Sequence, residues 1–135
     1  MKRFNFLYLL PLFCLGLVMT SCGDDDDDVN NTITITIEEP LNGETITDCS
    51  QVHVHVDFVA SDENHEVEVV LHPEGDVNDK IIDIDMHGHD QEITIEQEVD
   101  LCSYPAGTCF HLEVQACIDH DCEQTENAEV EFCLQ

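Results

Sequence analysis

From residue 32 to residue 134, apolar residues recur at every second position, and no stretch has the period of about 3.6 residues that marks a helix. Successive side chains of a strand point to opposite faces of a sheet, so this spacing gives each strand one apolar face. Turn-forming residues such as those of Pro40–Gly43, Pro73–Gly75 and Pro105–Gly107 separate the alternating stretches. The alternation therefore predicts an all-β domain in which every strand buries one face.

We expect seven strands, at residues 32–38, 51–60, 66–72, 80–87, 92–101, 108–118 and 127–134. Seven short strands in about 100 residues are typical of an immunoglobulin-like β-sandwich, whose two sheets pack their apolar faces together. The first, second, fifth and fourth strands would then form one sheet, and the third, sixth and seventh strands the other. In the fourth strand, Ile82, Ile84 and Met86 would point inward.

A second region, Leu101–Gln115, supports the same fold by resemblance. Its segment Tyr104–Thr108 precedes the sixth strand and resembles the corner between strands E and F of bacterial immunoglobulin-like domains. The resemblance implies the general sandwich class for residues 32–135 and no particular activity. The Trp of antibody domains is absent, because the chain contains no Trp.

The N-terminus has the layout of a secretory signal. Lys2 and Arg3 precede an apolar run at residues 4–18, which is short for a membrane span of about 20 residues. Met19, Thr20, Ser21 and Cys22 follow, and this segment resembles a bacterial lipoprotein signal. The resemblance implies that residues 1–21 are removed and that Cys22 carries the lipid; the alternative is an ordinary signal with a chance cysteine.

After Cys22 come Gly23 and the acidic run 24–28, which repels itself and should remain solvated. Residues 22–31 would thus form a flexible tether. Cys-Gly followed by acidic residues resembles the surface-export signal of Bacteroidota-type lipoproteins, and the whole chain resembles their small surface lipoproteins of uncharacterised function. This implies a lipid anchor in the outer membrane, facing the exterior. The alternatives are the periplasmic face and a simple spacer.

The cysteines that remain after the signal predict a disulfide framework. An even number of cysteines in an exported domain favours disulfides. In the expected strand order, the ends of strands 51–60 and 92–101 meet, and strands 108–118 and 127–134 form a hairpin. The pairings that follow are Cys49–Cys102, Cys117–Cys122 and Cys109–Cys133. The rival arrangement joins Cys102 to Cys109 and Cys49 to Cys133.

The charge of the chain restricts its partners. Lys80 is the only Lys or Arg after the signal, whereas the chain has 31 acidic residues. Such a protein repels phosphates, which excludes nucleic acid as a partner, and it should contact membranes only through its lipid. Its field favours cationic partners or metal ions.

Histidine is the most informative residue type, because all eight lie in the expected domain. His53 and His55 would point outward beside Glu98 and Glu96 of strand 92–101. Strand 80–87 would add Asp83 beside Glu96, and His87 beside Glu92. Imidazole and carboxylate are ligands for zinc or copper. The sequence predicts a possible site on that sheet face; ionic pairs on a solvated surface are the alternative. Its candidate ligands are His53, His55, His87, Glu96 and Asp83.

Asp119, Asp121 and Glu123 place carboxylates at alternate positions, which suggests a weaker candidate for calcium. However, the calcium-binding helix–loop–helix pattern requires a Gly at its sixth position, where this chain has Gln124. The alternative is a solvated acidic hairpin.

No catalytic pattern is present. The chain lacks a Gly-x-Ser-x-Gly nucleophile motif, and Val69 stands where a zinc protease would have the second histidine after His65 and Glu66. We therefore expect a non-enzymatic surface module with a binding, adhesion or accessory role, whose ligand is a surface protein or a glycan. The alternative function is binding of a divalent metal: copper or zinc, and less readily calcium. No cofactor is expected besides such an ion.

Overall fold

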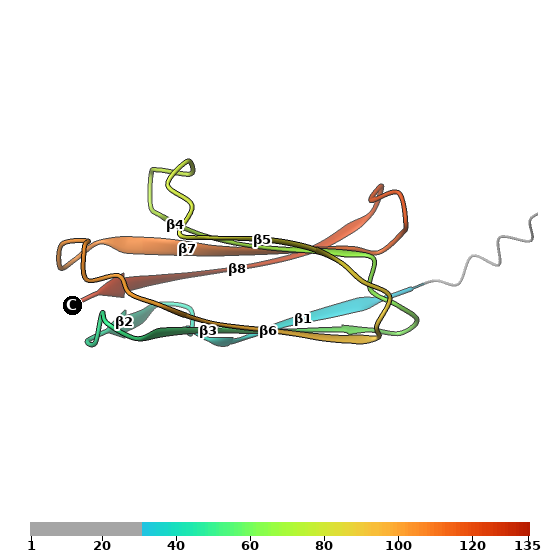
Figure 1. Ribbon diagram of the computed structural model, residues 1–135, viewed down its shortest axis with the longest axis horizontal. Coiled ribbons are helices and arrows are strands. Elements are labelled where there is room, and N and C mark those ends of the chain that lie inside the picture. Colours follow the sequence, from blue (N-terminus) through green and yellow to red (C-terminus); the bar gives the residue numbers. More distant parts are fainter. Residues whose placement is uncertain (1–30) are drawn as a thin grey trace, which may run out of the picture.

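The computed structural model describes residues 31–135, which form two β-sheets packed face to face (Figure 1). The expected signal, the lipidated Cys22 and all but the last residue of the tether lie outside the described residues. Residues 31–135 contain eight strands and no helix, so the predicted all-β immunoglobulin-like sandwich is confirmed.

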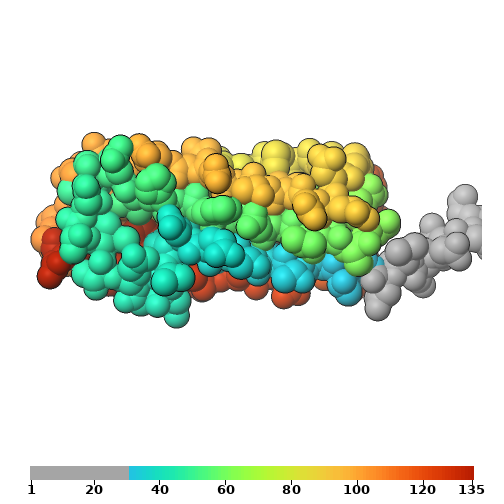
Figure 2. Space-filling model, turned by 90° about the horizontal axis from the view of Figure 1, so that it is seen from below, coloured from blue at the N-terminus to red at the C-terminus, as the bar shows by residue number. Residues whose placement is uncertain are grey.

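The two sheets differ in size. The small sheet has the strand order β1–β3–β6 and the large sheet the order β2–β8–β7–β4–β5. The strands of the small sheet are β1 (Ile33–Glu39), β3 (Val52–Ala60) and β6 (Glu92–Val99). Those of the large sheet are β2 (Glu44–Ile46), β4 (Glu66–Pro73), β5 (Ile82–His87), β7 (Cys109–Cys117) and β8 (Thr125–Leu134). Figure 2 shows the outer face of the small sheet, where β1, β3 and β6 run side by side.

The fourth expected strand belongs to the other sheet. β5 pairs antiparallel with β4, so that Val69 lies opposite Ile84 and Glu66 opposite His87. The prediction that this strand joins the small sheet beside β6 is therefore wrong. Its apolar residues alternate with acidic ones, and this pattern suits an edge strand of either sheet equally well.

The exposure of Met86 follows from the position of β5 in the large sheet. Met86 was expected inward, yet 37% of the residue is exposed, whereas Ile82 on the same strand is buried. Because the small sheet has only three strands, it leaves this end of the outermost strand β5 uncovered.

The additional strand β2 begins directly after the turn that the sequence predicts at Pro40–Gly43. The chain leaves β1, passes Pro40 and Gly43, and pairs parallel with the end of β8. Gly43 has a φ of 78°, a conformation that glycine adopts without the steric penalty of a Cβ. The N-terminal segment thus contributes one strand to each sheet and ties the two together along one edge.

The core lies between the sheets and is built from the predicted apolar faces. Phe110 and Phe132 stack with their ring centroids 5.4 Å apart and are fully buried. Phe58 and Leu101 are also fully buried. Because these side chains come from several strands, the core requires both sheets to be assembled.

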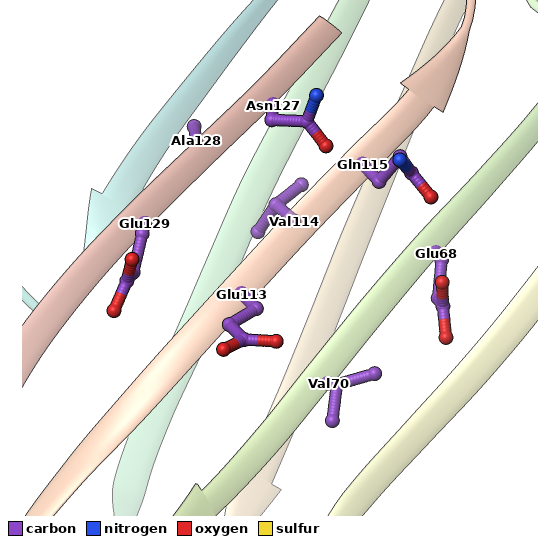
Figure 3. Close-up of a pocket in the computed structure, with 8 residues that line it drawn as sticks. All are labelled: Glu68, Val70, Glu113, Val114, Gln115, Asn127, Ala128 and Glu129. Carbon is purple, nitrogen blue, oxygen red and sulfur yellow. The ribbon is translucent and has the colours of Figure 1, made fainter. Parts of the chain in front are cut away.

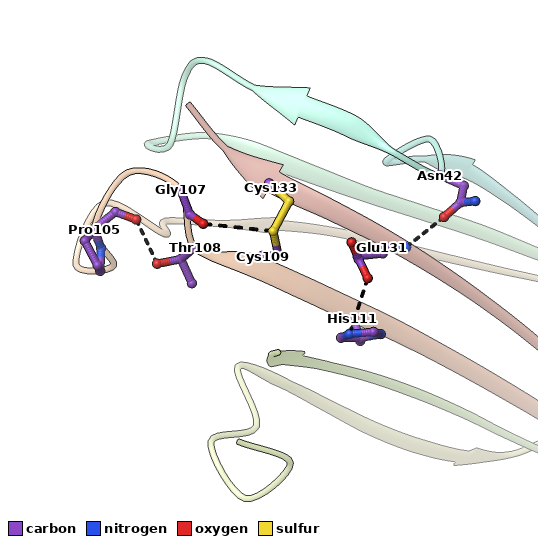
Figure 4. The surroundings of a disulfide bond; sticks show 8 residues. All are labelled: Asn42, Pro105, Gly107, Thr108, Cys109, His111, Glu131 and Cys133. Atoms are coloured by element: carbon purple, nitrogen blue, oxygen red, sulfur yellow. Dashed lines mark hydrogen bonds and ion pairs between the residues drawn. A yellow bond between two sulfur atoms is a disulfide. The ribbon is translucent and has the colours of Figure 1, made fainter. Parts of the chain in front are cut away.

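The three predicted disulfides are all present: Cys49–Cys102, Cys109–Cys133 and Cys117–Cys122. Cys109 and Cys133 lie directly opposite each other on β7 and β8, with Cα atoms 4.0 Å apart (Figure 4). The rival pairing of Cys102 with Cys109 is wrong. Neighbouring strand ends determined the connectivity, as expected from the strand order.

Candidate functional site

Part of the predicted metal face is assembled as expected. β3 and β6 pair in the predicted register, with His53 opposite Glu98 and His55 opposite Glu96. His53 Nε2 lies 3.6 Å from Glu98 Oε2, and His55 Nδ1 lies 3.9 Å from Glu96 Oε1. Glu39 joins these side chains around a shallow hollow on the outer face of the small sheet. We call these residues the small-sheet group.

Two of the predicted ligands lie elsewhere. Because β5 pairs with β4, Asp83 and His87 are on the large sheet, and the predicted contacts of Asp83 with Glu96 and of His87 with Glu92 are wrong. Asp83 instead accepts a hydrogen bond of 2.8 Å from the Lys80 ammonium group. This contact raises the pKa of Lys80.

The predicted calcium ligands do not converge within the described part of the chain. Asp119 uses both carboxylate oxygens to accept backbone hydrogen bonds from Glu123 and Gln124, at 2.8 and 2.9 Å. Among residues 31–135, Asp119, Asp121 and Glu123 are not one of the groups whose ligand atoms come together. The first carboxylate therefore stabilises the β7–β8 turn.

The outer face of the large sheet carries an acidic groove over β4, β7 and β8 (Figure 3). Glu113 lies directly opposite Glu129 across β7 and β8, and opposite Val70 across β4 and β7. Val70, which is 7% exposed, lies directly opposite Glu113, so the lining combines carboxylates with an apolar side chain (Figure 3). We call this surface the acidic groove. Its full lining is Glu68, Val70, Glu113, Val114, Gln115, Asn127, Ala128 and Glu129.

A pair of stacked histidines adjoins this groove. The rings of His72 and His111 have centroids 5.7 Å apart and are nearly parallel. His111 Nδ1 is hydrogen-bonded to Glu129, and its Nε2 lies 3.7 Å from Glu131 Oε2 (Figure 4). His72 is 4% exposed and its Nε2 lies 3.4 Å from Glu113. His111 is thus held by a carboxylate hydrogen bond, whereas His72 Nε2 is buried without a hydrogen-bond partner in the described structure.

The third and densest histidine group lies at the end of the sandwich where β1 begins. His65, His87, His89 and His120 surround one another there, with Glu63 beside them. The ring centroids are 5.0 Å apart for His87 and His89, 5.6 Å for His65 and His120, 6.1 Å for His87 and His120, and 6.2 Å for His65 and His89. We call these five residues the pole cluster.

The sequence interpretation missed this cluster, although its elements were visible. In an alternating antiparallel sandwich, the β3–β4, β5–β6 and β7–β8 connections all lie at the same end. Each of these connections carries or adjoins a histidine, and one contains the pair His87-Gly88-His89. Comparing the loops that share an end, instead of the strands that share a face, could have found it.

Comparison with known proteins assigns this chain to no family. A scan of models of protein families finds no match, and no curated protein matches the chain. Within residues 31–135 no helix is long and apolar enough to cross a membrane.

Proposed function

We propose that this chain is a lipid-anchored, non-enzymatic surface module that binds a cationic protein partner through the acidic groove. The N-terminal resemblance to a lipoprotein signal supports the anchor at Cys22, and the acidic run after Gly23 supports an outer-membrane location facing the exterior. A sandwich on a tether is suited to presenting one sheet face to a partner.

The observation that carries the proposal is the pairing of Glu113 with Glu129. Like charges directly opposite each other on a sheet destabilise the pair, and a positive group placed between them would remove that repulsion. Val70, directly opposite Glu113, offers apolar contact to the carbon chain of a lysine or arginine. The groove therefore fits a basic side chain better than a neutral or acidic one.

Binding of an oligolysine peptide to the full chain, with an oligoglutamate peptide of equal length as the comparison, tests this proposal. Replacing Glu68 and Glu113 together by Gln should weaken oligolysine binding about twofold to thirtyfold, since exposed ion pairs contribute about 0.2–1 kcal/mol each. Affinity should also fall as salt is raised from about 0.05 M to about 0.5 M, because the charges are screened.

The matched control removes the same charge from the small sheet, with Glu92 and Glu98 replaced by Gln. If this variant weakens binding as much as the groove variant does, the peptide responds to net charge alone and the assignment of the groove is wrong. Absence of salt-dependent binding would contradict the proposal as a whole.

A second candidate function is binding of zinc or copper by the small-sheet group. The register that brings His53 and His55 beside Glu98 and Glu96 favours it. The separations of 3.6 and 3.9 Å are those of ion pairs; His53, Glu98 and Glu96 are exposed, and His55 is half-buried. A metal titration of the variant with His53 and His55 replaced by Ala tests this candidate, and that variant also serves as a control in the experiment below.

A further inference from the structure

The pole cluster combines donor atoms that belong together in a transition-metal site. Glu63 lies between two of its histidines: its Oε2 is 3.1 Å from His89 Nδ1 and its Oε1 is 3.8 Å from His65 Nδ1. The ligand atoms of these three residues all lie within 4.8 Å of one another. Zinc–nitrogen bonds of about 2.0–2.1 Å place neighbouring ligand atoms somewhat closer than this, a difference that side-chain rotation can close.

One histidine of the cluster has an unmet polar atom. The side chain of His65 is only 12% exposed, and its Nδ1 is buried without a hydrogen-bond partner in the described structure. A buried polar atom without a partner is unfavourable, and native proteins usually satisfy it. A metal ion, which accepts an imidazole lone pair, would satisfy this nitrogen.

Two of the loops that carry the cluster are held together by hydrogen bonds. Asn64 is fully buried, and its side-chain amide donates to the carbonyls of Asp90 and Gln91 at 2.9 and 3.1 Å. The backbone N–H of Gly88 donates to the carbonyl of His65 at 2.8 Å. The β3–β4 loop, which carries His65, and the β5–β6 loop, which follows His87 and carries His89, are thereby fixed relative to each other.

The β7–β8 loop, which carries His120, is also connected to the β3–β4 loop by hydrogen bonds. The side-chain amide of Asn31 donates to the carbonyls of Glu63 and Ile118, at 2.8 and 3.0 Å. The disulfide Cys117–Cys122 closes the turn that contains His120. A metal site held on such connected loops is preorganised, because its ligands lose little freedom when the ion binds.

We propose that the pole cluster binds one divalent transition-metal ion, zinc or copper, through Glu63, His65 and His89, with His87 and His120 completing the coordination. Four imidazoles and one carboxylate are a donor set that suits both ions, whereas calcium and magnesium prefer oxygen ligands. Cysteine takes no part, since the cysteines near the cluster are joined in a disulfide. This site is separate from the acidic groove and does not depend on its proposed function.

Isothermal titration of the full chain in detergent with Zn²⁺, and separately with Cu²⁺, tests the site. Free thiols are alkylated beforehand, and excess Mg²⁺ occupies the exposed carboxylates. We expect one stoichiometric site. Replacing His89 and His120 by Ala should weaken it more than about hundredfold, since even an outer-shell partner accounts for tenfold to hundredfold. Both residues are exposed, so the sandwich should fold without these imidazoles.

The matched control replaces His53 and His55 by Ala, which removes the same number of imidazoles from the small sheet. This variant should retain the site. Side-chain NMR of the histidine ring nitrogens gives a second readout, in which one equivalent of Zn²⁺ should shift the signals of His65, His87 and His89. Loss of binding in the small-sheet variant alone, or only weak multi-site heats in the wild type, would overturn the proposal.

Discussion

At the scale of the residue, polar side chains hold the two ends of the sandwich in place. Asn64 does so at the pole, through hydrogen bonds to the β5–β6 loop. At the opposite end, Tyr104 donates a hydrogen bond of 2.8 Å to Asp79 and packs its ring edge-on against Phe110. Both side chains connect loops that are distant in sequence, so their loss should affect the fold more than ordinary surface changes do.

The pKa of Tyr104 predicts how the contribution of this residue to stability changes with pH. Burial, followed by the hydrogen bond to Asp79, raises the pKa of this phenol. A raised folded-state pKa means that the stabilisation is present below the unfolded value of about 10 and is lost as pH rises through the folded value. Tyr104→Phe keeps the ring contact and should lower the unfolding free energy by about 0.5–1 kcal/mol at neutral pH.

The measurement is urea unfolding of both proteins at neutral pH and above the pH at which free tyrosine ionises. The difference between wild type and Tyr104→Phe should shrink at the higher pH. If it stays constant or grows, the hydrogen bond to Asp79 is not what links this residue to stability.

At the scale of the element, the disulfides illustrate what alternation predicts well. Once the order of β3, β6, β7 and β8 is known, the ends that carry cysteines are neighbours, and the connectivity follows. The register of β3 with β6 was predictable for the same reason, because Cys49–Cys102 aligns the two strands.

The sheet to which β5 belongs could not be predicted in this way. Ile82 and Ile84 alternate with Asp83 and Asp85, and an edge strand of either sheet would show this pattern. The choice depends on which neighbour covers the apolar face, a property of the assembled molecule. The error displaced Asp83 and His87 from the predicted metal face.

The disulfides Cys49–Cys102 and Cys117–Cys122 should differ in their effect on stability according to the loops that they close. Cys49 and Cys102 are 53 residues apart, and Cys117 and Cys122 are 5 apart. Loop-closure entropy gives about 4 kcal/mol for the first and about 2 kcal/mol for the second. Replacing each pair by Ala should lower the unfolding free energy in that order, as urea denaturation under oxidising conditions would measure.

Equal losses for the two pairs would show that strain or denatured-state structure outweighs loop entropy.

The short loop closed by Cys117–Cys122 should also affect metal binding, because it carries His120. Opening Cys117–Cys122 should weaken metal binding at the pole, whereas opening Cys49–Cys102 at the far end should leave that binding unchanged as long as the protein remains folded.

At the scale of the whole molecule, the arrangement of the ends relates the proposed sites to the proposed anchor. Asn31 lies at the pole, where it bonds to the carbonyls of Glu63 and Ile118. Asn31 is nine positions from Cys22 along the sequence, with eight residues between them, and such a segment spans at most about 30 Å. In the proposed lipoprotein, the pole cluster is therefore the end nearer the membrane, and the acidic groove extends away from it along the large sheet.

The anchor itself gives the last prediction. Cys22→Ser should abolish incorporation of labelled fatty acid and release the protein from the membrane fraction, because lipidation requires the thiol and a lipid-free chain has no other strong attachment. The fold should be unaffected, since Cys49 and the five later cysteines form their disulfides without this residue. Protease treatment of intact cells, which degrades exterior proteins only, then distinguishes the two membrane faces. Continued membrane retention of the Cys22→Ser variant would mean that the N-terminal segment is held there as an uncleaved signal.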